Sequence, residues 1–123
     1  MQKILVCDDD ANIRNIMDFS LEAEGFQVVE APDGDAALRL AVTEQPDLVL
    51  LDVMMPGNDG LTVCRHLKEN PATKHIPVLL LTARSSKADR EAGLAAGADD
   101  YITKPFSPQR LVDKVTELLG AHN

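Results

Sequence analysis

Five short apolar runs, each followed by a stretch with the periodicity of a helix, restrict the fold of this chain more than any other feature. The runs have strand length and cover residues 4–6, 28–29, 48–51, 78–81 and, more weakly, 101–102. Each following stretch presents one apolar stripe, as Ile13, Met17 and Leu21 do in the first. The runs are wholly apolar, which is typical of strands buried on both faces. This alternation predicts a parallel sheet with right-handed crossovers and helices on both sides.

Glycine, proline and serine mark the expected ends of these helices. Glycine favours the left-handed conformation at a helix C-terminus, and it stands at Gly25, Gly97 and Gly120. Pro46 stops the second helix, and Ser107 before Pro108 is typical of an N-cap and a first helical position. Residues 32–34 and 56–60 are expected to be loops, because they are rich in Pro, Gly, Asn and Asp.

Length and charge exclude several classes of protein. The chain has 123 residues, so we expect a single domain over residues 1–123. Its 20 acidic and 12 basic side chains give a net charge of −8, which argues against direct binding to nucleic acid. No apolar run approaches the ~20 residues needed to cross a bilayer, so we expect no membrane association. Met1 is followed directly by the strand-like residues 3–7 instead of a signal peptide, which favours a cytoplasmic location.

Polar residues follow four of the five predicted strands. They are Asp8, Asp9 and Asp10 after the first strand, Asp52 after the third, Thr82 after the fourth and Lys104 after the fifth. In parallel sheets, ligands bind beyond the carboxyl ends of the strands, at the point where the strand order reverses. If the order is 2-1-3-4-5, the first and third strands are neighbours there, and Asp8, Asp9 and Asp52 converge. The sequence then predicts one polar site at this edge of the sheet.

A cluster of carboxylates in a crevice needs a cation. Two carboxylates about 4 Å apart repel each other by roughly 4 kcal/mol at an effective dielectric constant of ~20. A Mg²⁺ ion bound by oxygen atoms relieves this repulsion and keeps water ligands that a phosphate can replace. With Lys104 as a positive charge and Thr82 as a hydroxyl donor, the set suits phosphoryl transfer. Asp52 is the expected nucleophile, because a carboxylate can form an aspartyl phosphate.

Over residues 4–119 the sequence resembles the receiver domains of response regulators in two-component signalling. The resemblance rests on the motifs ILVCDDD at 4–10, DLVLLDVMMPG at 47–57, LTA at 81–83 and GADDYITKPF at 97–106. It implies an α/β fold of the flavodoxin-like (βα)5 type, which is a doubly wound five-stranded parallel sheet with strand order 2-1-3-4-5.

The resemblance also implies which residues hold the metal ion and the phosphoryl group. Asp9 corresponds to a direct Mg²⁺ ligand, and Asp8 acts through water. Asp52 corresponds to the phosphoacceptor, and the backbone carbonyl of Met54 completes the metal site. Asp10 matches no position of the site and is expected to cap the first helix.

Three further residues correspond to the switch of the family. Thr82 matches the hydroxyl that turns towards the phosphoryl group, and Lys104 matches its ion-pair partner. Tyr101 matches the aromatic residue that changes rotamer with Thr82. The resemblance also implies a cis peptide bond between Lys104 and Pro105.

The implied activity is signalling and not the turnover of a substrate. A sensor histidine kinase or a histidine phosphotransfer protein donates the phosphoryl group to Asp52, and the domain assists its own phosphorylation and dephosphorylation. Met54 and Arg84 stand where the family tunes the rate of hydrolysis. A population shift through Thr82 and Tyr101 then alters the face of the fourth helix, fifth strand and fifth helix. That face signals to an effector protein or to an output domain missing from this sequence.

Arg110 departs from the pattern of receivers that dimerise through this face. Those receivers commonly carry an acidic residue there, which pairs with a base at the place of Arg90. Asp99, Asp100 and Lys114 match the other charges of that interface. Opposed arginines favour a monomer, or at most a weak phosphorylation-dependent dimer.

Three alternatives would use the same residues differently. A phosphatase of the haloacid dehalogenase type also has Asp-x-Asp after its first strand, here Asp8 and Asp10. Its last acidic motif follows the lysine, however, whereas Asp99 and Asp100 precede Lys104. An unphosphorylated interaction module would not need the complete set of acids, hydroxyl and lysine. A flavin-binding protein would need Ser, Thr or Gly in place of the aspartates after the first strand.

Overall fold

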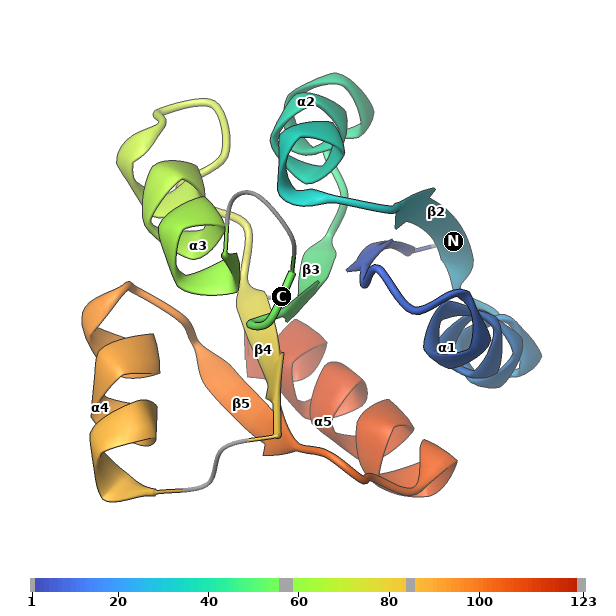
Figure 1. Cartoon of the computed structure of the whole chain (residues 1–123). Helices are drawn as coiled ribbons and strands as arrows, with labels where there is room; N and C mark the ends of the chain where they lie inside the picture. The colour runs from blue at the N-terminus through green and yellow to red at the C-terminus, as the bar shows by residue number, and fades with distance from the viewer. Residues whose placement is uncertain (1, 56–58, 84–85, 122–123) are drawn as a thin grey trace.

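A five-stranded parallel sheet forms the centre of the structure (Figure 1). The computed structural model describes residues 2–55, 59–83 and 86–121. The strands are β1 (Lys3–Cys7), β2 (Gln27–Ala31), β3 (Leu48–Asp52), β4 (Val78–Thr82) and β5 (Asp100–Thr103). The helices are α1 (Ala11–Ala23), α2 (Gly34–Glu44), α3 (Gly60–Glu69), α4 (Lys87–Ala95) and α5 (Pro108–Ala121). The strand order is β2-β1-β3-β4-β5, so the predicted fold class is confirmed.

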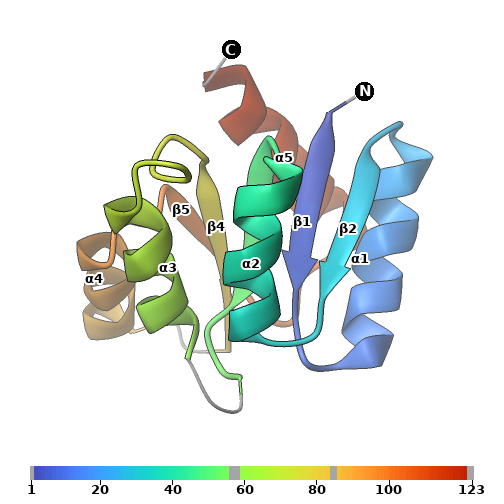
Figure 2. The ribbon, with the colours of Figure 1, turned by 90° about the horizontal axis from the view of Figure 1, so that it is seen from above.

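The helices form two layers, one on each face of the sheet (Figures 1 and 2). Alternate residues of a strand point to opposite faces. On one face Leu5 and Leu51 pack with residues of α2 and α3, and on the other Val6 and Leu50 pack with residues of α1 and α5. Every residue of β3 and β4 is buried, which agrees with their apolar sequence up to the last residue of each strand. The described residues contain no helix with the length and apolarity that a membrane crossing requires.

Side-chain caps fix where the helices begin. The carboxylate of Asp10 accepts from the N–H groups of Asn12 and Ile13, so Asp10 caps α1 as predicted. Asp33 caps α2 and Asp59 caps α3 in the same way. At α5 the hydroxyl of Ser107 accepts from the N–H of Arg110 at 3.1 Å. These caps determine the direction in which the chain leaves the loops around the carboxyl ends of the strands.

The glycine predictions are partly wrong. Gly25 and Gly97 have φ values of 90° and 98°, as expected for left-handed residues after a helix. Gly120 instead lies inside α5, where packing of the preceding Leu118 and Leu119 against the core keeps the chain helical. Gly34 and Gly60, predicted to lie in loops, are the first residues of α2 and α3, because the aspartate before each one caps the helix.

Candidate functional site

The polar residues predicted from the strand ends come together at the carboxyl edge of the sheet. Asp52 is the last residue of β3 and Thr82 the last of β4, whereas Asp8 directly follows β1 and Lys104 follows β5. Carboxylate oxygens of Asp8, Asp9 and Asp52 lie within 4.8 Å of one another. Asp8 and Asp52 are buried, with 0% and 4% exposure, while Asp9 is exposed. The described residues thus bring three acidic groups to one place, with one of them open to solvent.

Lys104 bridges the two buried carboxylates. Its Nζ lies 3.1 Å from Oδ2 of Asp8 and 3.2 Å from Oδ1 of Asp52. The peptide bond to Pro105 is cis, as the sequence resemblance implied, and the N–H of Lys104 donates to the carbonyl of Thr82 at 2.7 Å. The side chain therefore enters the site from β5 at a place fixed by both backbone and carboxylate contacts.

The pKa values of Asp52 and Lys104 reflect the excess of negative charge at the site. Burial and the charge of Asp8 raise the pKa of Asp52, although Lys104 opposes the effect. Burial lowers the pKa of Lys104, but its hydrogen bond to Asp8 and the charges of Asp52 and Asp8 outweigh burial and raise that pKa overall. One lysine therefore does not offset three carboxylates, so a further positive charge at this place is favourable.

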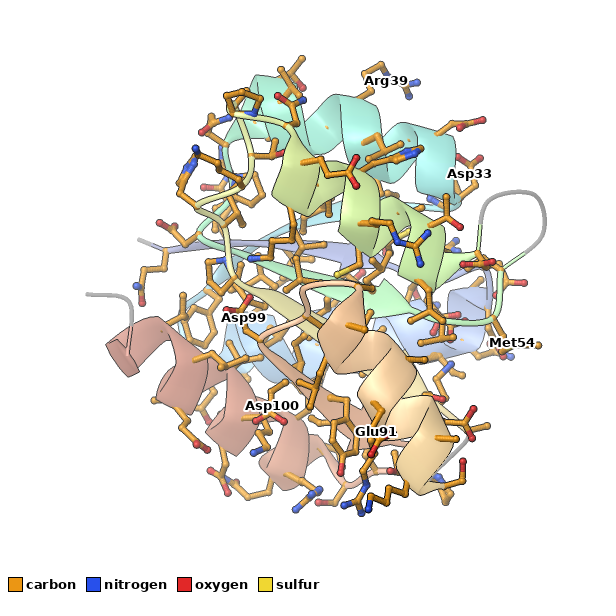
Figure 3. The ribbon with its side chains drawn as sticks, turned by 90° about the vertical axis from the view of Figure 1, so that its left-hand side faces the viewer. Asp33, Arg39, Met54, Glu91, Asp99 and Asp100 are labelled. Atoms are coloured by element: carbon orange, nitrogen blue, oxygen red, sulfur yellow. The ribbon has the colours of Figure 1, made fainter. Side chains whose placement is uncertain are left out.

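Mg²⁺ fits this donor set. Oxygen atoms are the ligands that Mg²⁺ prefers, and it is usually bound through one or two carboxylates with water in the remaining positions. Asp8 and Asp52 offer buried carboxylates, and Asp9 offers one at the exposed side. The N–H of Met54 donates to Oδ1 of Asp52 at 3.3 Å, which places the backbone of Met54 beside the same carboxylate. Figure 3 shows Met54 and Asp33 at this end of the molecule, and Asp99 towards the other end.

Asp10 is the one aspartate of its triplet that lies outside the group. Its carboxylate caps α1, and its N–H donates to Oδ1 of Asp8 at 2.9 Å. The Asp-x-Asp pair of a haloacid dehalogenase phosphatase would need both Asp8 and Asp10 in the site. The placement of Asp10 removes the main support for that alternative.

The two predicted switch residues both lie beside a small cavity between α4 and the sheet. Thr82 and Tyr101 both line it, and its volume is about 40 Å³. Thr82 is 8% exposed, and Cζ of Arg90 stands 5.2 Å from the centre of the Tyr101 ring. Arg84, for which a role in hydrolysis was inferred, lies outside the described residues, as do residues 56–58 of the third-strand motif.

Sequence reasoning missed two residues that touch the site. Gly60 approaches the backbone of Asp52 and Val53 so closely that a Cβ would overlap it. Arg14 of α1 donates from Nη1 to the carbonyl oxygen of Asp8 at 2.6 Å. A glycine beside a helix cap is also typical of a loop, and an arginine on a helix is usually solvated. Neither residue therefore gave a distinctive signal.

Known proteins share both this fold and this sequence pattern. A family model described as the response regulator receiver domain matches residues 4–116, and the chain belongs to this family. It is a receiver domain of the response regulators of two-component signalling.

Two relatives show how far the sequence likeness extends. The phosphate regulon transcriptional regulatory protein PhoB of Escherichia coli is 49% identical over 118 residues, which is 96% of this chain and 52% of PhoB. The response regulator PleD of Caulobacter vibrioides is 50% identical over 117 residues, 94% of this chain and 26% of PleD. The chain therefore spans about half of PhoB and a quarter of PleD.

Solved structures agree with the fold. The receiver domain of the Francisella response regulator 1452 superposes with a TM-score of 0.93 at 35% identity and covers 100% of both chains. A putative response regulator of Chloroflexus aurantiacus gives a TM-score of 0.92 at 38% identity, covering 97% of this chain and 98% of the other.

Proposed function

We propose that this domain accepts a phosphoryl group on Asp52 from the phosphohistidine of a sensor histidine kinase or of a histidine phosphotransfer protein in the cytoplasm. The observation that carries the proposal is the bridge of Lys104 between two buried carboxylates, with a third carboxylate within 4.8 Å. The proposed Mg²⁺ site consists of Asp9, Asp52 and the backbone carbonyl of Met54 as direct ligands, with Asp8 acting through water. When bound, Mg²⁺ supplies positive charge for the phosphoryl oxygens during transfer.

The residues of the site divide the work of the transfer. An oxygen of Asp52 forms a bond to phosphorus as the bond from phosphorus to the histidine nitrogen breaks, and that nitrogen keeps the electron pair. The N–H of Met54 holds the Asp52 carboxylate at 3.3 Å, which limits its rotation. Lys104 Nζ, 3.2 Å from Oδ1 of Asp52, is close enough to bind an oxygen of the incoming group. The same residues support the later hydrolysis of the aspartyl phosphate by water, so the domain assists both its own phosphorylation and its own dephosphorylation.

The output of the switch is proposed to be the face of α4, β5 and α5. Thr82 lies at the end of β4 and shares the 40 Å³ cavity with Tyr101 of β5. In the phosphorylated state the Thr82 hydroxyl turns to donate to the phosphoryl group, and Tyr101 changes rotamer in the space this leaves. The altered face then binds an effector protein or an output domain.

The charges on this face favour a monomer. Arg90 stacks over Tyr101 within the chain, and Lys114 Nζ pairs with Oδ2 of Asp100 at 2.7 Å. Arg110 adds a second positive charge where an acidic partner for Arg90 would be needed. We expect light scattering with beryllofluoride and Mg²⁺ to give a monomer or a weak dimer. A stable dimer crosslinked through this face would contradict the charge argument.

Intact mass after incubation with acetyl phosphate tests the phosphorylation. The wild type should gain one phosphoryl group in Mg²⁺ and none in EDTA, and Asp52→Ala should gain none. Asp113→Asn on α5 is the matched control, because Asp113 is exposed and lies outside the site. A folded wild type that binds Mg²⁺ but gains no phosphoryl group from acetyl phosphate or from a phosphorylated kinase would refute the proposal. Phosphomonoester hydrolysis that survives Asp52→Ala would instead favour a phosphatase.

A further inference from the structure

Arg14 connects the acidic loop after β1 to the neighbouring strand β2. It lies in the first turn of α1, and its Nη1 donates to the carbonyl oxygen of Asp8 at 2.6 Å. Its Nε lies 3.9 Å from Oε1 of Glu30 in β2. The Arg14 side chain is only 18% exposed. The guanidinium is therefore held between two elements and is not a solvated group on a helix surface.

The carbonyl of Asp8 needs such a partner. β1 ends at Cys7, so the strand pairing of the sheet stops one residue before Asp8. Asp8 is fully buried, and a buried carbonyl without a hydrogen bond costs free energy comparable to a lost hydrogen bond. Arg14 supplies a charge-assisted donor at this point.

Fixing this carbonyl also directs Asp9. The carbonyl of Asp8 and the N–H of Asp9 belong to one rigid peptide plane, so holding the oxygen sets the direction in which the chain continues to Asp9. The Asp8 side chain is already fixed by the N–H of Asp10 at 2.9 Å and by Lys104. No ion pair or side-chain hydrogen bond is seen for the exposed Asp9 carboxylate within residues 2–55, 59–83 and 86–121. Its position therefore depends on the backbone that Arg14 holds.

Arg14 and Lys104 act on the acidic group in different ways. Lys104 binds the carboxylate oxygens directly. Arg14 binds a backbone carbonyl and Glu30, so it brings a positive charge close to the loop and leaves the carboxylate oxygens available to a metal ion. Of these two residues, only Arg14 can support a cation site without binding the carboxylate oxygens that would hold the cation.

We infer that Arg14 is a positioning residue for the metal site: through the carbonyl of Asp8 it orients Asp9 for binding of Mg²⁺. The inference rests on the proposed function, because it concerns the same cation site. Residues that orient metal ligands typically contribute 10–100-fold to metal affinity. Arg14→Gln is therefore expected to weaken Mg²⁺ binding about tenfold or more. Once Mg²⁺ is saturating, the rate of phosphorylation should return close to that of the wild type.

Calorimetric titration with MgCl₂ is the direct test, with the free energy of unfolding measured in EDTA on the same samples. Arg14→Lys should recover part of the affinity, because a lysine keeps the positive charge and can donate a hydrogen bond to the same carbonyl. Arg39→Gln on α2 is the matched control, since it removes the same charge from an exposed side chain that points outward (Figure 3). Wild-type affinity is expected for it.

The outcomes separate this inference from the proposed function. If folded Arg14→Gln or, should that variant not fold, Arg14→Met binds Mg²⁺ as tightly as the wild type at equal ionic strength, Arg14 does not position the site. An equal loss in Arg39→Gln would show that only net charge matters, which also overturns the inference. If the wild type itself binds no Mg²⁺, the proposed function and this inference both fail.

Discussion

Replacing Gly60 by alanine is expected to lower stability and to disturb the candidate site together. Gly60 begins α3, and its N–H donates to the carbonyl oxygen of Val53 at 2.9 Å. A Cβ here would overlap the carbonyl oxygen of Asp52 and lie 2.7 Å from Cα of Val53. Both contacts are to backbone atoms, so no side-chain rotation relieves them. The start of α3 has to move away from the end of β3, which carries the proposed phosphoacceptor.

The expected size of the effect has two parts. Overpacking of this kind costs about 1–3 kcal/mol, and weakening the hydrogen bond between Gly60 and Val53 adds about 1 kcal/mol. Gly60→Ala should therefore lower the free energy of unfolding by roughly 2–4 kcal/mol. For a domain of this length, each kcal/mol corresponds to roughly 3–4 °C in Tm. A Tm lower by about 6–16 °C is expected, together with slower phosphorylation of Asp52.

Urea unfolding followed by circular dichroism measures the loss, and two other glycines serve as controls. A Cβ on Gly93 would meet only Cδ1 of Leu80 at 3.0 Å, the flexible end of a side chain, so a small loss is expected. A Cβ on Gly120 meets nothing within 4 Å, and alanine there should stabilise α5 by up to about 0.5 kcal/mol. If Gly60→Ala unfolds within about 0.5 kcal/mol of the wild type, the reasoning about this close approach is wrong.

Three further predictions concern charge and metal. Mg²⁺ at 100 times its Kd should stabilise the fold by about 2.7 kcal/mol, and equal Tm values in Mg²⁺ and EDTA would rule out a specific site. Lys104→Met removes the ammonium group that pairs with the buried Asp8 and Asp52, so the free energy of unfolding in EDTA should fall by about 3 kcal/mol. Added Mg²⁺ should restore part of this loss. An equal loss in EDTA and in Mg²⁺ would contradict the prediction. Burial and the hydrogen bond to Glu30 raise the pKa of Asp18 to about 7. The folded state therefore keeps a proton on Asp18 that the unfolded chain releases near pH 4. Because the folded state binds this proton more tightly, the free energy of unfolding falls as the pH rises from about 4 to about 7. Asp18→Asn should therefore flatten the dependence of Tm on pH between about 4 and about 7, and parallel profiles for the two proteins would refute it.

The convergence of distant residues was predictable because it depends on topology alone. Asp8 and Lys104 are 96 positions apart in the chain and lie in contact, since each follows a parallel strand at the same edge of the sheet. The apolar runs located all five strands, although β2 extends over Gln27–Ala31 and not only residues 28–29. It includes Gln27 and Glu30, which are exposed at the edge of the sheet, so a search for apolar runs does not find its full length.

Features that depend on packing between elements were not predictable in the same way. Gly120 has the residue type of a helix end, but whether a helix ends there depends on what the neighbouring leucines contact. Arg14 gains its role from a carbonyl at the end of β1 and a carboxylate in β2, and no spacing in the sequence encodes that pair of contacts. A single sequence therefore locates the acidic and basic groups of the candidate site better than the residues that hold them in place.

The positions of the start of β1 and the end of α5 determine how the domain can be attached to another protein or to a surface. β1 begins and α5 ends at the edge of the sheet opposite to the acidic group (Figure 2), and Gln2 and Leu119 line one groove there. This follows from the winding, because every strand runs towards the site and every helix returns from it. A fluorescent protein, an affinity tag or a sensor surface joined at either end is held on the far side of the domain. The edge of the sheet that carries Asp52 then faces free solution, so immobilised protein should remain open to a phosphoryl donor as large as a kinase.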